Sequence, residues 1–248
     1  MTLLLIEGLD LAGKSTAVHG VMRALQEAGH QVRLCRNALT VDNPIHAQAD
    51  AARMANVLDR ATIGGLYVAA HALDLVGYAS QSHSGFQLQD SSWLRCLALH
   101  RTLARQEPTG SSAHVVAALL ALRPLAPRFR RAVFLRASIS ARAHRLRRRE
   151  REAPASVDEM DRWVLTDPDR FLAVEEALRR CVYQASDLVV EIDTTDLSPA
   201  DVVSSILYAL TSPRDCEQEM PVPDNYEGSE LSVTAGLDEA ALLGGHHK

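Results

Sequence analysis

A glycine-rich loop between a short apolar run and a helical pattern constrains this fold more than any other feature. Residues 3–6 are apolar, residues 8–16 read GLDLAGKST, and a helical pattern follows from Ala17. The loop fits G-x-x-x-x-G-K-[ST] in the strand–loop–helix setting that the motif requires. Its glycines let successive backbone N–H groups face one anion, and the positive end of the next helix points to the same place. We therefore expect the chain to bind a nucleoside triphosphate.

Two side chains of this phosphate loop (residues 8–16) carry the expected chemistry. Lys14 can reach the β- and γ-phosphates, and the hydroxyl of Ser15 can ligate Mg²⁺, the cofactor that accompanies ATP. The loop residues predicted to bind ATP are Gly8, Leu11, Ala12, Gly13, Lys14, Ser15 and Thr16.

The rest of the chain alternates strand and helix patterns. Strands are predicted near 3–7, 31–36, 86–89, 132–135 and 188–192. Helices are predicted near 14–28, 46–59, 63–79, 91–106, 114–122, 139–149, 168–185 and 199–210, with a break at Gly64-Gly65 and a charged loop at 150–157. This alternation predicts an α/β fold: a doubly wound parallel five-stranded sheet with helices on both faces. Functional residues should follow the carboxyl ends of the strands.

The charge distribution divides the chain in two. The net charge is −5, yet residues 212–248 carry eight acidic residues against two basic ones. This segment also contains Pro, Gly and Ser without sustained periodicity. We predict a kinase-like domain at 1–211 and an acidic, largely disordered tail at 212–248.

Composition also bounds location and partners. No apolar run is long enough to cross a membrane, and the start of the chain lacks the pattern of a signal peptide. The four cysteines are scattered without metal-ligand spacing, which is typical of reduced thiols. We expect a cytoplasmic protein that binds small molecules, with no membrane and no nucleic acid among its partners.

The phosphate loop and its flanks resemble the thymidylate kinase family, which opens with E-G-[LVI]-[DE]-x-A-G-K-[ST]-T. Here Glu7 and Asp10 supply the two acidic positions of that pattern. Element order and spacing are similar across residues 1–211. The resemblance implies a P-loop kinase fold, transfer of the ATP γ-phosphate with Mg²⁺, and a homodimer, since dimers are common in the family.

On the acceptor side, the resemblance assigns residues one at a time. Arg36 matches an Arg that ends the second strand and meets the acceptor phosphate, and Asp10 matches a residue that meets the acceptor sugar. His71 stands where the family has a phosphate-reading Arg, while Arg95 and His100 lie on the helix that reads thymine. Because these last three differ from the family pattern, we expect an acceptor other than dTMP. Because Arg suits a phosphate or carboxylate, Arg36 favours a nucleotide-like anionic acceptor.

An arginine cluster follows the fourth strand and resembles the family's R-x-x-x-R lid, placed here at about 145–160. The resemblance implies that Arg145 anchors the lid base on the ATP side and that Arg149 or Arg151 meets the transferred phosphoryl group. Asp193 resembles a residue near the adenine. The alternative is a solvated basic helix face or a nucleic-acid patch.

Two carboxylates have more than one interpretation. Asp90 is predicted to hold Mg²⁺ together with Ser15, and its alternative role is to cap the following helix. Asp10 could order the loop through backbone hydrogen bonds or act as a base toward an acceptor hydroxyl.

The sequence therefore predicts an ATP-dependent phosphotransferase with Lys14, Arg149, Arg151 and Asp10 as catalytic residues. The first hypothesis is a kinase for a nucleotide or nucleotide-like anionic acceptor. The second is a kinase for a nucleoside or another small hydroxyl compound. The third is a degenerate nucleotide-binding protein without kinase activity.

Overall fold

Five parallel strands form the centre of the computed structural model, which describes residues 2–80, 85–108 and 110–211. The strands are β1 (Thr2–Glu7), β2 (Val32–Arg36), β3 (Phe86–Asp90), β4 (Arg131–Arg136) and β5 (Val189–Asp193). They lie in the order β2-β3-β1-β4-β5, and all pairs are parallel. The central strand β1 is an almost unbroken apolar run because both of its faces are covered. The predicted fold class is confirmed.

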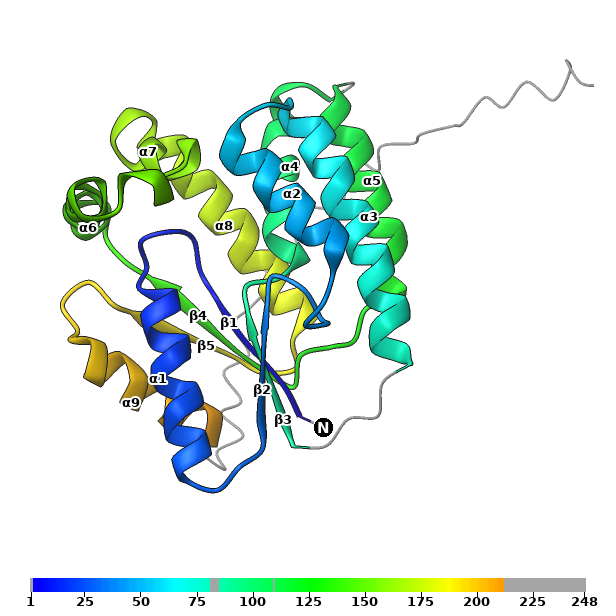
Figure 1. Cartoon of the computed structure of the whole chain (residues 1–248). Helices are drawn as coiled ribbons and strands as arrows, with labels where there is room; N and C mark the ends of the chain where they lie inside the picture. Colours follow the sequence, from blue (N-terminus) through cyan, green and yellow to red (C-terminus); the bar gives the residue numbers. More distant parts are fainter. Residues whose placement is uncertain (1, 81–84, 109, 212–248) are drawn as a thin grey trace, which may run out of the picture. The chain divides into compact units, whose positions relative to one another are not determined.

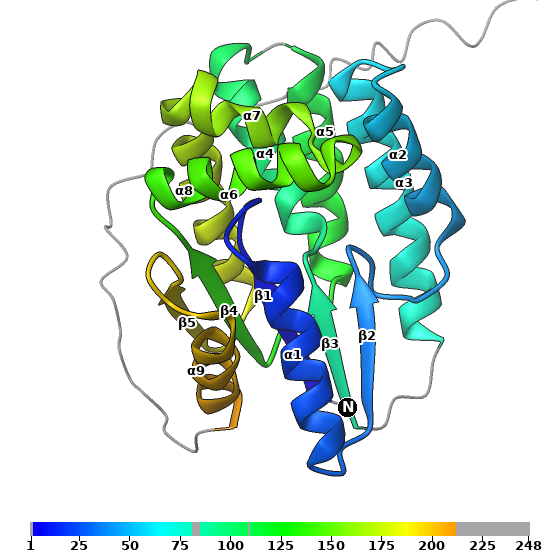
Figure 2. The ribbon, with the colours of Figure 1, turned by 60° about the vertical axis from the view of Figure 1, so that its left-hand side comes forward.

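Helices cover both faces of this sheet (Figure 1). The described helices are α1 (Lys14–Glu27), α2 (Pro44–Ala55), α3 (Arg60–Ala79), α4 (Trp93–Gln106), α5 (Ser111–Leu122), α6 (Ile139–Glu152), α7 (Glu159–Thr166), α8 (Pro168–Ala185) and α9 (Pro199–Thr211). Helices α1 and α9 lie on one face, and α4, α5 and α8 lie on the other. Helices α6 and α7 lie beyond the carboxyl ends of the strands (Figure 2).

Two hydrophobic clusters separate cleanly because successive side chains of a strand point to opposite faces. Leu4 and Ile6 of β1 pack with α1 and α9, whereas Leu3 and Leu5 pack with the larger helical layer. The sheet is thereby fixed between two apolar layers. The phosphate loop and the ends of β3 and β5 are held at one rigid edge.

Helix α3 runs without interruption through Gly64-Gly65, so the predicted break there is wrong. The chain instead turns at residues 56–59, where Asn56 adopts a left-handed conformation and the Asp59 carboxylate caps α3. A Cβ at Gly64 would lie 2.5 Å from His100 Nε2. The glycine therefore serves close packing of α3 on α4, and this tertiary contact outweighs its low helix propensity.

Helix α7 has no counterpart among the predicted elements. It begins with a capping box in which Asp158 and Asp161 exchange hydrogen bonds with each other's backbone N–H. The predicted charged loop is accordingly shorter, and α6 continues to Glu152 before a 3-10 turn at Pro154–Ser156. The lid is therefore mostly helical.

Two further predictions concern the C-terminal segment and membrane-spanning helices. The predicted acidic tail at 212–248 lies outside the described residues. None of the described helices is both long and apolar enough to cross a membrane.

Candidate active site

The phosphate loop follows β1 at the carboxyl edge of the sheet and leads into α1. Gly8 is required there because a Cβ would lie 2.5 Å from the carbonyl oxygen of Leu135. Gly13 has φ +87°, and Leu11 also adopts a left-handed conformation with φ +66°. The first-turn N–H groups of a helix lack intrahelical acceptors, and α1 has no acidic residue in that turn. The loop is thus shaped and charged to hold an anion.

Lys14 and Asp90 meet at the centre of this edge. Lys14 Nζ lies 3.2 Å from Asp90 Oδ1, with both side chains largely buried. Directly behind them, the wholly buried carboxylate of Glu7 accepts hydrogen bonds from Gly8 N, Ser91 Oγ and Ser92 Oγ. Burial raises the pKa of Glu7. These contacts hold Ser91 at φ +65° and fix the direction in which Asp90 points.

The donor set around Asp90 suits Mg²⁺. Ser15, the residue after Lys14, contributes a hydroxyl at the exposed start of α1, and Asp90 contributes a carboxylate. Mg²⁺ prefers such hard oxygen ligands and usually shares its coordination sphere with phosphates and water. The residues therefore fit the predicted metal.

The arginines of α6 divide by helix face. Arg142, Arg145 and Arg149 face inward at i, i+3 and i+7, whereas Arg147, Arg148 and Arg151 are exposed. Arg145 donates to the carbonyl oxygens of Leu11 (2.8 Å) and Thr194 (2.6 Å). It therefore connects the lid helix to the phosphate loop and to the end of β5.

Arg142 makes the deeper connection. Its guanidinium is fully buried and donates to the carbonyl oxygens of Asp10 (3.0 Å) and Ala137 (2.9 Å). It also forms an ion pair with the buried Glu175 of α8. One side chain thus joins the phosphate loop, the lid helix and the α8 layer. Arg142 is not among the sequence-predicted site residues, although its spacing to Arg145 and Arg149 could have shown that it faces inward.

The other predicted ATP-side and lid residues lie apart from this centre. Asp193 ends β5 at the surface, and its carboxylate accepts hydrogen bonds from Thr195 N and Oγ1, which lower its pKa. Arg151 Nε donates to the carbonyl oxygen of Arg147 in its own helix, 3.3 Å away. Arg149 alone of the two predicted phosphoryl-binding arginines lines the cavity described next.

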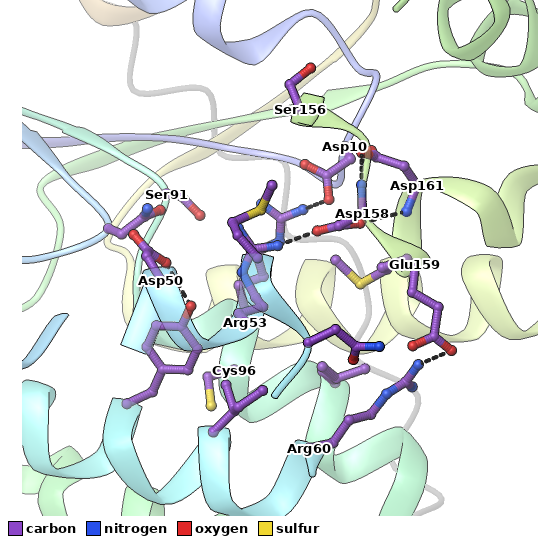
Figure 3. Close-up of a pocket in the computed structure, with 18 of the residues that line it drawn as sticks. Asp10, Asp50, Arg53, Arg60, Ser91, Cys96, Ser156, Asp158, Glu159 and Asp161 are labelled. Carbon is purple, nitrogen blue, oxygen red and sulfur yellow. Dashed lines mark hydrogen bonds and ion pairs between the residues drawn. The ribbon is translucent and has the colours of Figure 1, made fainter. Parts of the chain in front are cut away.

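A cavity of about 650 Å³ opens beside the phosphate loop. Its walls come from α2, α3 and α4, and its roof is the lid segment 154–163 (Figure 3). The floor is partly aromatic because His71 stacks on Trp93 with ring centroids 4.8 Å apart. Asp10 belongs to both the loop and the cavity wall, so it stands between the two.

The predicted acceptor residues are only partly brought together. Asp10, His71, Arg95 and His100 line the cavity, but Arg36 does not. Arg36 is exposed at the end of β2, and its Nη2 lies 2.7 Å from His19 Nε2 of α1. His71 and His100 are buried, and burial lowers the pKa of each to about 4. Both imidazoles are therefore uncharged at neutral pH.

Four arginines of the cavity are each paired with a carboxylate. Arg95 pairs with Asp10, Arg53 with Asp158, Arg60 with Glu159 and Arg149 with Asp161. The fifth arginine of the lining, Arg162, is exposed. The charges of the wall and roof therefore largely compensate one another. Four of these paired residues are not among the sequence-predicted site residues: Arg53, Arg60, Asp158 and Asp161. The only sequence signal for any of them is the capping-box spacing of Asp158 and Asp161, which indicates a helix start.

The charged and buried surroundings shift the pKa values of Asp10 and Asp161 in opposite directions. Burial opposes ionisation of Asp10, but the charges of Arg95 and Lys14 outweigh it and lower its pKa. Burial raises the pKa of Asp161 to about 7, and the neighbouring Asp10 and Asp158 charges add to the effect. Asp10 is therefore an ionised carboxylate beside the loop, while Asp161 can hold a proton.

Comparisons with known proteins identify the fold. No protein-family model matches the chain, and no curated protein matches it in sequence. Solved structures of deoxyadenosine kinase from M. mycoides do resemble it. The structure with the products dCMP and a flexible dCDP bound has 14% identity and a TM-score of 0.55. Those with dCTP or dATP bound each have 16% identity and a TM-score of 0.52. Each of these three matches covers 85% of this chain and 100% of the chain in the solved structure. The chain therefore has the P-loop kinase fold of these structures.

Proposed function

We propose that this chain is an ATP-dependent phosphotransferase whose acceptor is a small nucleoside-like molecule bound in the cavity beside the phosphate loop. The observation that carries the proposal is the position of Asp10. It lies on the phosphate loop, two residues after Gly8, and also lines the 650 Å³ cavity. Donor and acceptor sites therefore share a wall, as phosphoryl transfer between two bound molecules requires.

The donor side supports ATP with Mg²⁺. Lys14, which lies beside Asp90, would contact the β- and γ-phosphates, and Ser15 and Asp90 would hold the metal. When bound, Mg²⁺ would neutralise charge on the β- and γ-phosphate oxygens. Arg149 is the lid cation that we assign to the transferred phosphoryl group, because Arg151 faces away from the cavity.

For the acceptor, the cavity favours the second hypothesis, a hydroxyl compound without a phosphate. The anionic acceptor was predicted from Arg36, which does not line the cavity, and Arg95 is already paired with Asp10. Four of the five lining arginines already have a carboxylate partner, so a phosphate here would have to compete for one of these ion pairs or use the exposed Arg162. An uncharged molecule would instead use the paired charges as hydrogen-bond donors and acceptors, with its ring over His71 and Trp93.

Asp10 is the base in this proposal. Its lowered pKa keeps it ionised at neutral pH, and Arg142 fixes its backbone through the carbonyl oxygen. The acceptor hydroxyl oxygen forms a bond to the γ-phosphorus and its proton passes to the Asp10 carboxylate. The bond between the γ-phosphorus and the bridging oxygen breaks, and ADP leaves.

The resemblance to thymidylate kinases leaves a specific rival. A nucleoside monophosphate acceptor would need a cation for its phosphate, which the exposed Arg162 could supply, or Arg53 or Arg60 once released from their carboxylate partners in the roof. ADP release from Mg-ATP, measured with a panel of nucleosides and nucleoside monophosphates, separates the two, with Lys14→Ala as the blank. Turnover with nucleosides supports the proposal. Turnover only with monophosphates supports the rival, and ATP binding without any turnover supports a nucleotide-binding protein.

A further inference from the structure

The roof of the cavity places three carboxyl groups within reach of one another. One side-chain oxygen each from Asp10, Asp158 and Asp161 lies within 4.8 Å of the other two (Figure 3). They come from two distant segments, the phosphate loop and the first turn of α7. The closed roof therefore brings negative charge from the lid against negative charge on the loop.

Each carboxylate has a guanidinium partner from a different helix. Arg95 of α4 pairs with Asp10, and Arg53 of α2 pairs with Asp158. Arg149 of α6 donates from one nitrogen to both oxygens of Asp161, each 3.3 Å away. Asp161 is the most buried of the three, and the only other hydrogen bond that its carboxylate accepts among the described residues comes from Asp158 N. Arg149 is thus the only cation in direct contact with Asp161 in the described chain.

Arg149 is also the lid cation that the proposed function assigns to the transferred phosphoryl group. A phosphate held at Lys14 carries more charge than one carboxylate, so it competes with Asp161 for this guanidinium. If Arg149 moves to the phosphate, a buried carboxylate is left beside two others. Such a group takes up a proton, because burial and like charges disfavour its ionised form.

We propose that Asp161 is a positioning residue that holds Arg149 at the roof in the empty enzyme and exchanges it for a solvent proton when Mg-ATP binds. This inference rests on the proposed function. The exchange keeps the roof neutral while Arg149 serves the phosphate. It also makes nucleotide binding depend on pH.

The sign of this dependence follows from Asp161. Its pKa of about 7 in the free protein means that it is about half protonated at pH 7. Release of Arg149 raises the pKa further, so binding takes up a fraction of a proton per ATP at pH 7, up to about one half. Mg-ATP affinity then falls by up to about fivefold between pH 7 and pH 8, because the proton must come from an increasingly alkaline solvent.

Calorimetry of Mg-ATP binding to the full chain, in two buffers of different ionisation enthalpy at pH 7, counts these protons directly. Asp161→Asn keeps the shape and the capping oxygen but cannot titrate, and Asp169→Asn changes an exposed Asp at the start of α8 as the control. We expect wild type and the control to take up more protons than Asp161→Asn, by up to about half a proton. Protons carried by ATP itself cancel in this difference.

The outcomes are distinct. Equal proton uptake in wild type and Asp161→Asn would overturn the inference while leaving the proposed function intact. Absence of Mg-ATP binding by wild type would overturn both. If Asp161→Asn does not fold, Asp158→Asn replaces it. The loss of one neighbouring charge should lower the pKa of Asp161, leave it less protonated before binding, and so increase the uptake at pH 7. An unchanged uptake in that variant also contradicts the inference.

Discussion

The candidate site has two halves, the phosphate loop (the loop half) and the cavity beside it (the cavity half), and they differ in the groups that would contact a ligand. The phosphate loop is a continuous stretch of nine residues whose anion-binding groups are mainly backbone N–H donors and a helix end. The cavity is built from side chains on five helices, and four of its arginines are paired with its own carboxylates. The loop therefore presents backbone donors and a helix end to an anion, with Lys14 held beside Asp90, whereas the cavity presents side-chain charges that are paired with one another. A molecule with several phosphates suits the first, and an uncharged polar molecule suits the second.

Arg142 joins the two halves, so its removal should have the largest effect. Arg142→Met would leave Glu175 buried without its partner, which costs about 3–5 kcal/mol. Urea unfolding of the variant would measure the loss. Arg148→Met is the matched control, because Arg148 is exposed on the same helix and pairs loosely with Glu152 at 3.7 Å. A loss for Arg142→Met no larger than that of the control would show that the two halves are not joined in this way.

Lys14 belongs to the loop half alone. Lys14→Ala should weaken Mg-ATP binding by about 2–5 kcal/mol, since a charge contact to the phosphates is lost from a partly buried site. The lower end of this range corresponds to about a 30-fold rise in the Kd for Mg-ATP. Calorimetry against Arg147→Ala, an exposed change on α6, would measure it. If Lys14→Ala bound Mg-ATP as tightly as wild type, the nucleotide would bind at a site other than the phosphate loop.

Two adjacent glycines test the packing of the cavity half. Gly64→Ala would place a methyl group 2.5 Å from His100 Nε2, so it should destabilise the fold by about 1–3 kcal/mol. Gly65→Ala meets nothing within 4 Å and should stabilise helix α3 by up to about 1 kcal/mol. Thermal unfolding of the pair gives both values. Equal effects would contradict the close approach of α3 to α4.

Arg36 should matter least. Because its side chain lies against His19 and outside the cavity, Arg36→Gln should change acceptor KM by less than about twofold, as expected for an exposed contact. Arg95→Gln, inside the cavity, is the comparison and should raise KM more. A large effect of Arg36→Gln would restore the anionic acceptor.

The loop half could be predicted because its residues are contiguous and the motif defines a backbone shape. The alternation of strands and helices follows from similar local patterns. The break at Gly64-Gly65 was wrong because a local helix-breaking tendency, worth about 1 kcal/mol, is overridden by packing against His100. No local pattern records which helix a glycine faces.

The cavity could be predicted only in outline. Asp10, Arg95, His71 and His100 do line it, yet the roof residues Asp158 and Asp161 come from a helix that the charged, proline-containing stretch concealed. Their partners Arg53 and Arg149 lie far apart in the sequence. Pairing of charges across helices depends on tertiary structure. The balanced charge of the cavity is therefore visible only once the fold is known.

The most direct test of the account is competition between a nucleoside and its own 5′-monophosphate. Wild type would be incubated with γ-labelled Mg-ATP and equal concentrations of each nucleoside of the panel and its own 5′-monophosphate, and each product would be separated and counted. The balanced cavity predicts that label enters the nucleoside first and yields labelled monophosphate. Label appearing only in the diphosphate made from the added monophosphate would contradict an uncharged acceptor site.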